Sequence, residues 1–505
     1  MSGSLRPLAE ALRSLSVPRA VALVAVGVGL ALGATHLPAP INLARGTRPD
    51  TTTGTHADPV TQTRSICPGP EALGVEGLPD SPAQTVTVAT VSAPVASLPS
   101  GFVAGAGAGS LTMSGLPSGG TWPAPVTSRG QVALAQIAVA RSALVTGVGS
   151  MAPGTVATQW SWTKTGYSRG LVTAACLPAA TSSWLIAGGA APGRLERLVL
   201  TNPGPNPVTV DLAVFGANGR IDSPDGLGLV VPAQARTVIL LNAIAGSEPS
   251  PVVHVTARGG KVAAVLSDTW LDGVVPRGGD DVVPVAAPAR EQVIAGIPID
   301  GPAILRVAVP GDSEAVVQSR VLTPAGPRPL PVDGVTRVAG RSTKDIDLSS
   351  LPPGAYAVQV GADVPVVAAV MVDRRAAAPA PSDFAWSVAS LPITTLAGMA
   401  LPTSEIKGLS QRLDLVAAKG SASVRVTTVG TGGEVSTKEV AVAADSVSTL
   451  ALDGAASVWV TPLTGSIRAA VLTSVTDVGG VLLSVTPLAD LTLTATSSPL
   501  RQLRD

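Results

Sequence analysis

The acids that could do chemistry gather in one short stretch of this sequence. With their aromatic and basic neighbours they are Asp268, Trp270, Asp272, Arg277, Asp280 and Asp281. Two carboxyl groups beside an aromatic ring suit glycoside hydrolysis, in which one carboxyl protonates the leaving group and the other acts as nucleophile or base. Carboxylate oxygens are also the ligands that Ca²⁺ prefers. The stretch therefore raises two hypotheses, a carbohydrate-active or other hydrolase and a calcium site.

The first of these acids belongs to a repeated motif, which favours a third interpretation. The segment Ala263–Asp268 returns as Ala368–Asp373 and again as Ala469–Ser474. An acid that recurs at the end of a strand is more simply a turn residue than a catalyst, because Asp side chains bond readily to nearby backbone N–H groups. We therefore expect a structural turn at Asp268, with calcium binding and catalysis as alternatives.

Two tryptophans form a second candidate. Trp160 and Trp162 are two residues apart in a strand-like run, so both side chains should point to the same face of a sheet. An exposed pair could stack on sugar rings or on a protein partner. Packing in a core or between domains is the alternative. Together with Asp268, Trp270 and Asp272, the two tryptophans form a possible binding surface.

The remaining inventory argues against an enzyme. The chain has only three His, so few side chains could serve as a general base at neutral pH. No G-x-S-x-G motif surrounds a Ser, and no Ser-His-Asp arrangement can be identified. Three His and two Cys are also too few for most metal sites. We therefore expect no catalytic, cofactor-binding or metal-ligating residues, and no cofactor.

Charge and composition exclude nucleic-acid binding and favour short strands. Lys plus Arg and Asp plus Glu both number 34, which gives a formal net charge of zero. A nucleic-acid-binding protein instead needs clustered positive charge to neutralise phosphates. The chain contains 54 Gly and 45 Pro among many Val and Thr residues. This mixture predicts many short strands joined by tight turns.

The N-terminal segment predicts an export signal. Three arginines in residues 1–19 precede an unbroken apolar run, Ala20–Ala34. Such a flank keeps the N-terminus in the cytoplasm and sends the following chain across the membrane. We assign residues 1–19 to a cytoplasmic tail and residues 20–36 to a transmembrane signal-anchor. A run this short also allows cleavage after residues 31–33, which would release a secreted protein.

The two cysteines predict a disulfide. Cys67 and Cys176 are the only cysteines, and both follow the membrane segment. An even count in an oxidising compartment favours one bridge over two free thiols. The bridge would close a loop of about 109 residues and contribute about 4–5 kcal/mol in the chain-entropy model.

Two landmarks recur at nearly constant spacing in the second part of the chain. Gly219, Gly326 and Gly433, each in a predicted hairpin, are 107 residues apart in both intervals. The alanine motifs start 105 and 101 residues apart. The sequence therefore predicts three tandem β-sandwich repeats. The full division after the anchor is a flexible, Thr-rich stalk at 37–66, a divergent β domain at 67–182, repeats at 183–288, 289–380 and 381–490, and a tail at 491–505.

Strand density sets the expected fold. About seven short alternating strands in each repeat of about 100 residues are typical of an immunoglobulin-like or fibronectin-like sandwich. A propeller is less favoured, because its blades repeat every ~40–50 residues. We expect an all-β protein, a row of tandem immunoglobulin/fibronectin-like β-sandwiches behind one N-terminal hydrophobic helix. The alanine motif would be the closing strand of each sandwich, and its small side chains would let the facing sheet approach closely.

Several loose motifs resemble a known family. They are Cys67-Pro-Gly-Pro, Cys176-Leu-Pro, Trp184 with Gly188-Gly189, and Leu200-Thr-Asn-Pro203. Over roughly residues 60–490 the chain resembles an uncharacterised family, a domain of unknown function found in actinobacterial, membrane-anchored secreted β-repeat proteins. The resemblance implies an envelope location. It implies no catalytic residues, because the family has none assigned.

These patterns favour a non-enzymatic, membrane-anchored extracytoplasmic protein of the bacterial cell envelope. Its expected partners are the membrane, through the N-terminal helix, and another envelope protein or a cell-wall glycan, with no nucleic acid. The alternatives are a hydrolase that uses the carboxylates of residues 268–281 and a purely structural spacer. A spacer would tolerate deletion of one whole repeat.

Overall fold

The computed structural model describes most of the chain beyond the predicted stalk. The described residues are 58–74, 85–105, 107–330, 334–374, 381–403, 406–477 and 479–495. All of them belong to one compact unit, Ala57–Asp505. The predicted cytoplasmic tail, signal-anchor and most of the stalk lie outside the described residues. Within the described part, no helix has both the length and the apolar character needed to cross a membrane.

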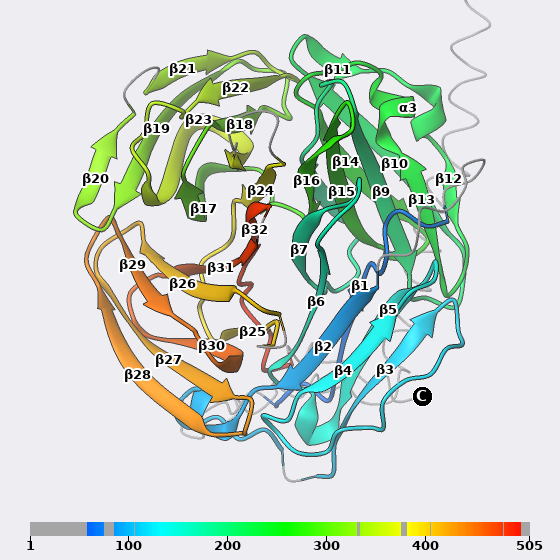
Figure 1. Cartoon of the computed structure of the whole chain (residues 1–505), viewed down its shortest axis with the longest axis vertical. Coiled ribbons are helices and arrows are strands. Elements are labelled where there is room, and N and C mark those ends of the chain that lie inside the picture. The colour runs from blue at the N-terminus through cyan, green and yellow to red at the C-terminus, as the bar shows by residue number, and fades with distance from the viewer. Residues whose placement is uncertain are drawn as a thin grey trace, which may run out of the picture. The chain divides into compact units, whose positions relative to one another are not determined.

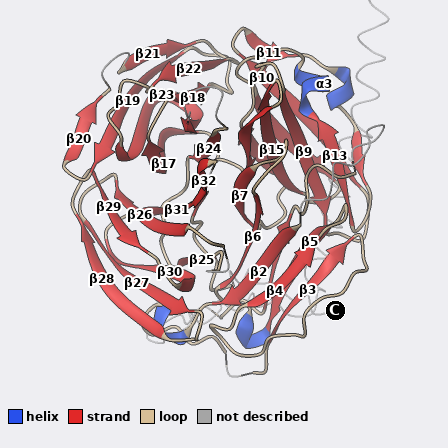
Figure 2. Cartoon of the chain, viewed as in Figure 1, coloured by secondary structure: helices blue, strands red, loops and turns tan. Residues whose placement is uncertain are grey.

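Strands are the dominant secondary structure of the described chain, which confirms the all-β prediction (Figure 2). The one α-helix among the described residues, α3, spans Leu241–Ala245. The three predicted hairpin glycines all lie in tight connections. Gly219, Gly326 and Gly433 have φ values of 119°, 106° and 87°, a backbone region that glycine enters without steric cost.

The described strands form four modules, each with two facing antiparallel sheets (Figure 1). Module 1 contains β1 (Gln62–Cys67), β2 (Val86–Ser92), β3 (Ser110–Leu116), β4 (Ala133–Ile137), β5 (Ser142–Val148), β6 (Thr155–Thr163) and β7 (Gly170–Ala175). Module 2 contains β8 (Ser182–Ile186), β9 (Arg194–Asn202), β10 (Val208–Gly216), β11 (Gly219–Ile221), β12 (Leu229–Val231), β13 (Ala235–Leu240), β14 (Val252–Arg258), β15 (Ala263–Asp272) and β16 (Val275–Val282).

The second half of the described chain repeats this plan. Module 3 contains β17 (Ala289–Ile299), β18 (Ala303–Ala308), β19 (Ala315–Thr323), β20 (Gly326–Pro329), β21 (Val335–Val338), β22 (Thr343–Asp347), β23 (Gly354–Arg374) and β24 (Asp383–Val388). Module 4 contains β25 (Ala397–Ala400), β26 (Leu409–Ala417), β27 (Ala422–Gly430), β28 (Val435–Val442), β29 (Ser446–Ala451), β30 (Ala455–Thr464), β31 (Arg468–Asp477) and β32 (Gly480–Pro487). The long strand β23 serves both sheets of module 3, since its first half pairs with β17 and β19 and its second half with β18 and β24.

One sheet of each module has the same strand order in all four modules, and we call it the axial sheet. The axial sheets are β4-β2-β6-β7, β13-β9-β15-β16, β22-β18-β23-β24 and β29-β26-β31-β32. The repeated alanine motif forms the third strand of this order, in β15, β23 and β31. It is therefore not the closing strand of its module, because one further strand follows it in each case.

That further strand brings the modules together. β7, β16, β24 and β32 each contact the next one in this order, and β32 contacts β7 (Figure 1). The ends of the described chain also meet, since Val60 N donates to Leu493 O at 2.9 Å and Ala495 N donates to Asp58 O at 2.7 Å. The expected row of sandwiches is therefore wrong. The modules close into a ring, because each of the strands β7, β16, β24 and β32 packs against the corresponding strands of two other modules. A row of separate sandwiches would leave these strands exposed to solvent.

The N-terminal end of the fold differs from the expectation in one detail. β1 begins at Gln62 and pairs along its whole length with β5, and Ile66 is buried. A flexible stalk can therefore not extend to residue 66. The predicted disulfide is confirmed, since Cys67 and Cys176 are bonded with a Cα–Cα distance of 4.3 Å. It joins the end of β1 to the segment after β7.

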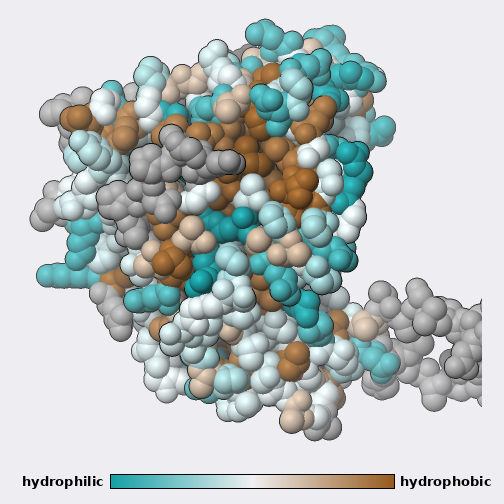
Figure 3. All heavy atoms as spheres, turned by 90° about the vertical axis from the view of Figure 1, so that its right-hand side faces the viewer, coloured by the Kyte–Doolittle hydropathy of each residue, from teal (hydrophilic) through white to brown (hydrophobic). Residues whose placement is uncertain are grey.

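Apolar cores lie between the two sheets of each module and also between modules. One cluster of buried residues joins module 1 to module 4, and another joins module 3 to module 4. On the face that Figure 3 shows, hydrophobic residues gather in one area, and hydrophilic residues are spread over much of the rest.

Candidate functional site

The four axial strands bring polar side chains together where the modules meet, and we call this group the hub. Its members are Thr173 on β7, Asp280 and Asp281 on β16, Asp383 on β24, and Ser484 and Thr486 on β32. All six are buried. Thr173 Oγ1 lies 2.9 Å from Ser484 Oγ and 2.8 Å from Thr486 Oγ1, which links the first module to the last.

Asp280 connects three modules. Its Oδ2 accepts a hydrogen bond from Trp386 N at 2.7 Å, and its Oδ1 accepts from Ser484 Oγ at 3.3 Å. Burial raises the pKa of this carboxyl to about 8, although the hydrogen bonds act in the opposite direction. Asp280 is therefore mostly a neutral acid at neutral pH. A neutral carboxyl costs far less to bury than a carboxylate.

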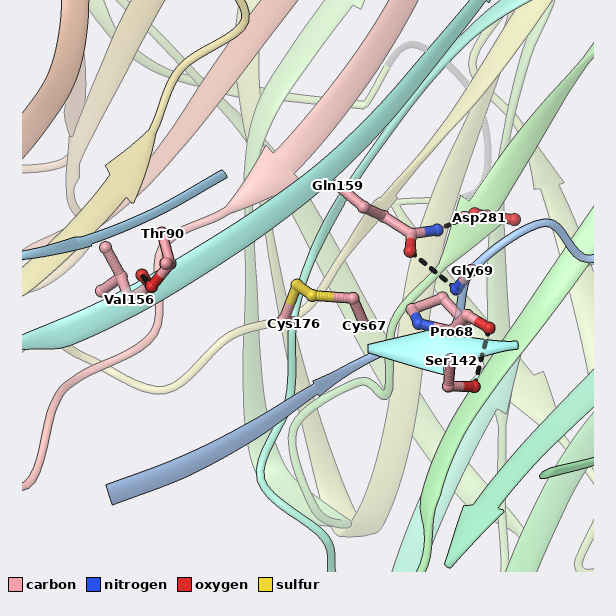
Figure 4. Close-up of a disulfide and its surroundings, with 9 residues drawn as sticks. All are labelled: Cys67, Pro68, Gly69, Thr90, Ser142, Val156, Gln159, Cys176 and Asp281. Carbon is pink, nitrogen blue, oxygen red and sulfur yellow. Dashed lines mark hydrogen bonds between the residues drawn. A yellow bond between two sulfur atoms is a disulfide. The ribbon is translucent and has the colours of Figure 1, made fainter. Parts of the chain in front are cut away.

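Asp281 joins the hub to the disulfide region (Figure 4). The amide of Gln159 donates to Asp281 Oδ2 at 3.0 Å and accepts from Gly69 N at 2.8 Å. Burial, together with the charges of Glu71 and Asp280, raises the pKa of Asp281 well above its usual value. Gly69 has φ of 74°, and a Cβ there would lie 1.9 Å from the carbonyl oxygen of Arg141. This close approach explains why glycine follows Cys67-Pro.

Asp383 is the third buried acid of the hub. Its Oδ2 accepts from Leu483 N at 2.9 Å, and its Oδ1 accepts from Phe384 N at 3.0 Å. Burial raises its pKa well above the usual value. Gly278 leaves room for this carboxyl, since a Cβ at that position would lie 1.9 Å from Asp383 Oδ1.

Asp268 lies inside β15, fully buried, so its interpretation as a turn residue is wrong. Its Oδ1 accepts from Arg194 Nε at 2.8 Å, and its Oδ2 accepts from Arg194 NH2 at 2.5 Å. Gly188 N and Trp386 Nε1 also donate to Oδ2, at 3.0 and 2.9 Å. Asp268 therefore anchors a bidentate ion pair between strands and contacts the next module.

The equivalent acid in module 3 makes a similar contact across a module boundary. Asp373 lies 3.3 Å from Arg277 NH2, which belongs to β16 of module 2. The first two copies of the motif thus share a buried acid with an arginine partner, whereas the third copy has Ser474 at this position. The sequence motif was a sign of internal ion pairing, and not of a turn.

Trp270 and Asp272 lie at the outer end of the same hairpin. The ring of Trp270 is half-buried, with the guanidinium groups of Arg194 and Arg277 at 5.2 and 4.9 Å from its centroid. Asp272 is exposed, and its carboxylate lies 3.9 Å from Arg277 NH1. The structure therefore separates the candidate acids: Asp272 faces solvent, whereas the other three are closed off from it.

The two tryptophans of β6 have unequal exposure. Trp160 is buried in the cluster that joins modules 1 and 4, and Trp162 packs against the edge of that cluster and is half-buried. Lys164 Nζ lies 4.4 Å above the Trp162 ring. A hollow of about 510 Å³ is open at this position, and its lining includes residues of β2, β4 and β6 together with Thr403 and Ile406.

The site offers little for acid–base or metal chemistry. No cluster of three or more potential metal ligands occurs in the described part of the chain. Ser182 Oγ and His254 Nε2 lie 2.8 Å apart, a pair that the sequence patterns did not reveal. The ring of His254 stacks on Trp184 at 4.1 Å, and among the described residues no carboxylate bonds to it. The third member of a triad is therefore missing there.

Sequence reasoning also missed the arginines that join modules 2 and 3. Arg306 is buried in β18, pairs bidentately with Asp345, and donates to the carbonyl of Gly188 in module 2 at 3.0 Å. Its guanidinium lies 5.2 Å from the centroid of the Trp386 ring. One signal was present, because a single arginine within an apolar run is unusual in a buried strand.

Comparison with known proteins gives one family and no function. A model described as "Family of unknown function (DUF5719)" matches residues 126–453, which confirms the resemblance to an uncharacterised family. No curated protein matches the chain.

Two solved structures give weak matches. The tetra-tandem repeat in the extending region of a large adhesion protein is 15% identical and has a TM-score of 0.10; the match covers 81% of this chain and 92% of that one. The alpha-L-rhamnosidase of Streptomyces avermitilis, complexed with L-rhamnose, is 13% identical and has a TM-score of 0.10, with 83% and 57% covered. Both TM-scores are too low to indicate a shared fold.

Proposed function

The chain belongs to the DUF5719 family, whose function is unknown, and we propose that this member is a non-enzymatic extracytoplasmic protein of the bacterial cell envelope that binds a protein or glycan partner. In this proposal residues 20–36 anchor it in the membrane and the ring of four modules is presented outside. Secretion after cleavage of that segment is the alternative. We also interpret each module as an immunoglobulin-like or fibronectin-like sandwich, on the basis of its two facing antiparallel sheets.

The single observation that carries a non-enzymatic role is the position of the carboxyl groups. Asp268, Asp280 and Asp281 are all buried and bonded to other modules or to a neighbouring strand. A hydrolase needs its acids to reach substrate and water. The arrangement instead suits a rigid scaffold, because each acid holds strands together.

The disulfide supports a location outside the cytoplasm. Cys67 and Cys176 are bonded, and such bridges persist in oxidising compartments but are rare in the cytosol. A reporter fusion at the C-terminus tests this location. We expect a fused alkaline phosphatase to be active in the native host and a fused fluorescent protein that folds only in the cytoplasm to stay dark. The opposite pattern would exclude the proposed topology.

Partner binding is tested by crosslinking in intact membranes. We expect the full-length chain to be recovered with an envelope protein or with wall glycan, and we expect this recovery to survive replacement of Asp272, the one exposed acid of the 268–281 stretch, by Asn. Recovery of the protein alone would contradict a binding role. If D272N is as stable as the unmodified chain but causes the same envelope defect as deletion of the whole protein, the hydrolase would be favoured instead.

A further inference from the structure

A break in main-chain pairing lies along one edge of β1. On one side, β1 pairs with β5 over Gln62–Cys67. On the other side, Ile66 N donates to Leu177 O at 2.7 Å, and Leu177 N donates to Ile66 O at 2.9 Å. Nearer the start of the described chain, Val60 N donates to Leu493 O at 2.9 Å. Between these two points, no backbone hydrogen bond joins the second edge of β1 to another part of the described chain.

Alternation along β1 directs the main-chain groups of two residues into this break. In an antiparallel sheet, the N–H and C=O of successive residues point alternately to the two neighbouring strands. Ile66 points away from β5, because both of its main-chain groups bond to Leu177. The pairing with β5 has no bulge, so Arg64 and Gln62 point the same way as Ile66. The N–H and C=O groups of Gln62 and Arg64 are therefore unpaired within the described chain.

A hollow of about 390 Å³ lies beside these groups, and we call it the β1 groove. Its lining includes residues 62–65 of β1, residues 154–158 at the start of β6, and residues 486–492 at the end of β32 and after it. The groove therefore lies where the first module meets the last. Its volume falls within the range of about 300–1,000 Å³ that is usual for ligand sites.

The lining of the β1 groove favours an apolar group. Its larger apolar residues include Val156, Met399 and Leu491. The two charged residues of the lining, Arg64 and Asp490, have opposite signs, so net charge selects neither an anion nor a cation. An apolar side chain of a ligand would gain stability by leaving water for this lining.

The spacing of the free main-chain groups identifies the class of ligand. Residues two apart in a strand lie about 6.6 Å apart along it, at ~3.3 Å per residue. A second extended polypeptide presents N–H and C=O groups at the same interval, so it can bond to Gln62 and Arg64 together. An oligosaccharide has no comparable series of amide donors and carbonyl acceptors. The described chain already uses this pairing at both ends of the break, through Leu493 and Leu177.

We infer that the β1 groove binds a short extended segment of a partner polypeptide, which adds a strand to β1 through the main chain of Gln62 and Arg64 and places an apolar side chain in the groove. The break from Val60 to Ile66 is about 20 Å long at ~3.3 Å per residue, which limits the paired segment to about three to five residues. This inference rests on the proposed binding role and deepens it, since it names a polypeptide as the partner class and locates its site. It does not depend on the proposed membrane topology.

The test is direct binding of blocked pentapeptides to the full-length chain, purified in detergent. The panel has Thr at the four outer positions and Ala, Val, Leu, Ile or Phe at the centre, and each peptide has a counterpart that is N-methylated at its three central amides. By calorimetry, we expect at least one peptide with a centre larger than Ala to bind at least about tenfold more tightly than its methylated counterpart. Methylation removes the donors that an added strand needs.

Residue-resolved hydrogen exchange locates the bound peptide. Binding should slow the exchange of the Gln62 and Arg64 amides at least about tenfold, because each amide gains or borders a new main-chain bond. The amides of Thr63 and Ser65 provide an internal control. They point to β5 and are already paired, so their exchange should change much less.

Two variants at one position separate the main chain from the side chain. Gln62→Pro removes one free N–H at the first residue of β1, a position where a strand tolerates proline, and leaves the bonds to β5 in place. It should weaken peptide binding at least about tenfold. Gln62→Ala is the matched control, because it keeps the N–H and removes only an exposed side chain, so its affinity should stay within about twofold. Urea unfolding of both variants separates lost binding from lost folding.

Four results would overturn the inference: no binding of any pentapeptide of the panel, equal affinity for a peptide and its methylated counterpart, unchanged exchange of Gln62 and Arg64 in the complex, or full affinity in folded Gln62→Pro. Slowed exchange of these two amides that grows with protein concentration, without any peptide, would also overturn it and would identify a second copy of this chain as the occupant. If the groove fails but crosslinking in membranes still recovers a partner, the proposed function stands and the partner binds elsewhere.

Discussion

At the scale of single residues, the repeated acid Asp268 acts in stability. Its carboxylate is fully buried and bonds to the equally buried Arg194. Removing one partner of a buried ion pair leaves the other charge uncompensated, which typically costs about 3–5 kcal/mol. We therefore expect Asp268→Asn to lower the free energy of unfolding by about 3 kcal/mol or more, measured by urea denaturation near neutral pH.

The matched control for this variant is Asp272→Asn, four residues along the same strand. The side chain of Asp272 is 75% exposed, so its replacement should change the free energy of unfolding by less than about 0.5 kcal/mol. Equal losses in both variants would show that Asp268 has no special role as an ion-pair partner.

A second prediction concerns pH and Asp280. Burial raises the pKa of this carboxyl to about 8 in the fold, from an ordinary value of 3.8. Between these two pH values the native state binds the proton and the unfolded chain does not, so stability falls as pH rises. The favourable contribution is complete below about pH 4 and is lost above about pH 8.

Asp280→Asn mimics the neutral form and cannot ionise. We expect its stability to depend less steeply on pH than that of the unmodified chain, with a difference of up to about 1.4 kcal/mol per pH unit in this window. Urea denaturation at several pH values from about 5 to about 8 measures the two slopes. Parallel slopes would mean that Asp280 is ionised in the fold throughout this range.

At the scale of elements, the small residues of the repeated motif control how closely modules approach. Gly296 of β17 faces Ala470 of β31 so closely that a Cβ on Gly296 would lie 2.6 Å from Ala470 Cβ. The alanines of this motif were expected to permit close approach of a facing sheet, and here the close neighbour is a strand of the adjoining module.

Enlarging this alanine should therefore weaken the boundary between modules 3 and 4. We expect Ala470→Leu to cost about 1–3 kcal/mol, because a well-packed interior cannot absorb three more carbon atoms without strain. The exposed Thr476 on the same strand provides the control, Thr476→Leu, which should be nearly neutral. A loss of the same size in both would point to an effect of leucine on the strand itself.

Much of the element pattern was readable from the sequence, because turns and alternation are local signals. The hairpin glycines Gly219, Gly326 and Gly433 adopt positive φ, as their predicted turns require. The disulfide between Cys67 and Cys176 followed from their number and compartment. The hub was not readable, since Asp383 and Ser484 belong to different strands whose meeting depends on the arrangement of whole modules.

The environment of the buried acids could likewise not be predicted from the sequence. In sequence, Asp268, Asp280 and Asp281 look like one cluster, but they bond to Arg194, to Trp386 N and to Gln159, partners that lie far away along the chain. A local pattern can mark an unusual acid. It cannot say whether that acid faces solvent or a neighbouring module.

At the scale of the described unit, the repeat length and the arrangement of repeats are separate properties. A period of about 105 residues fits one two-sheet module, and it led to the expectation of a row. The modules instead follow one another around an axis (Figure 1), and the two ends of the described chain pair at Pro59 and Thr494. A closed ring predicts that no module is dispensable, whereas a row of spacers predicts the reverse.

Deletion of residues 289–388, which form module 3, distinguishes the two. The deletion removes Trp386 and Asp383, so Asp268 and Asp280 lose bonded partners and β16 and β32 lose a neighbour. Buried polar groups without partners are strongly destabilising, so we expect a chain that is insoluble or lacks a cooperative urea transition. The control is a chain that keeps all four modules and carries a short Gly/Ser insertion at the exposed turn of Gly433. This variant should keep the cooperative urea transition. A three-module chain that is soluble and unfolds cooperatively would mean that the modules are stable without the ring, and that the hub contributes little to holding them.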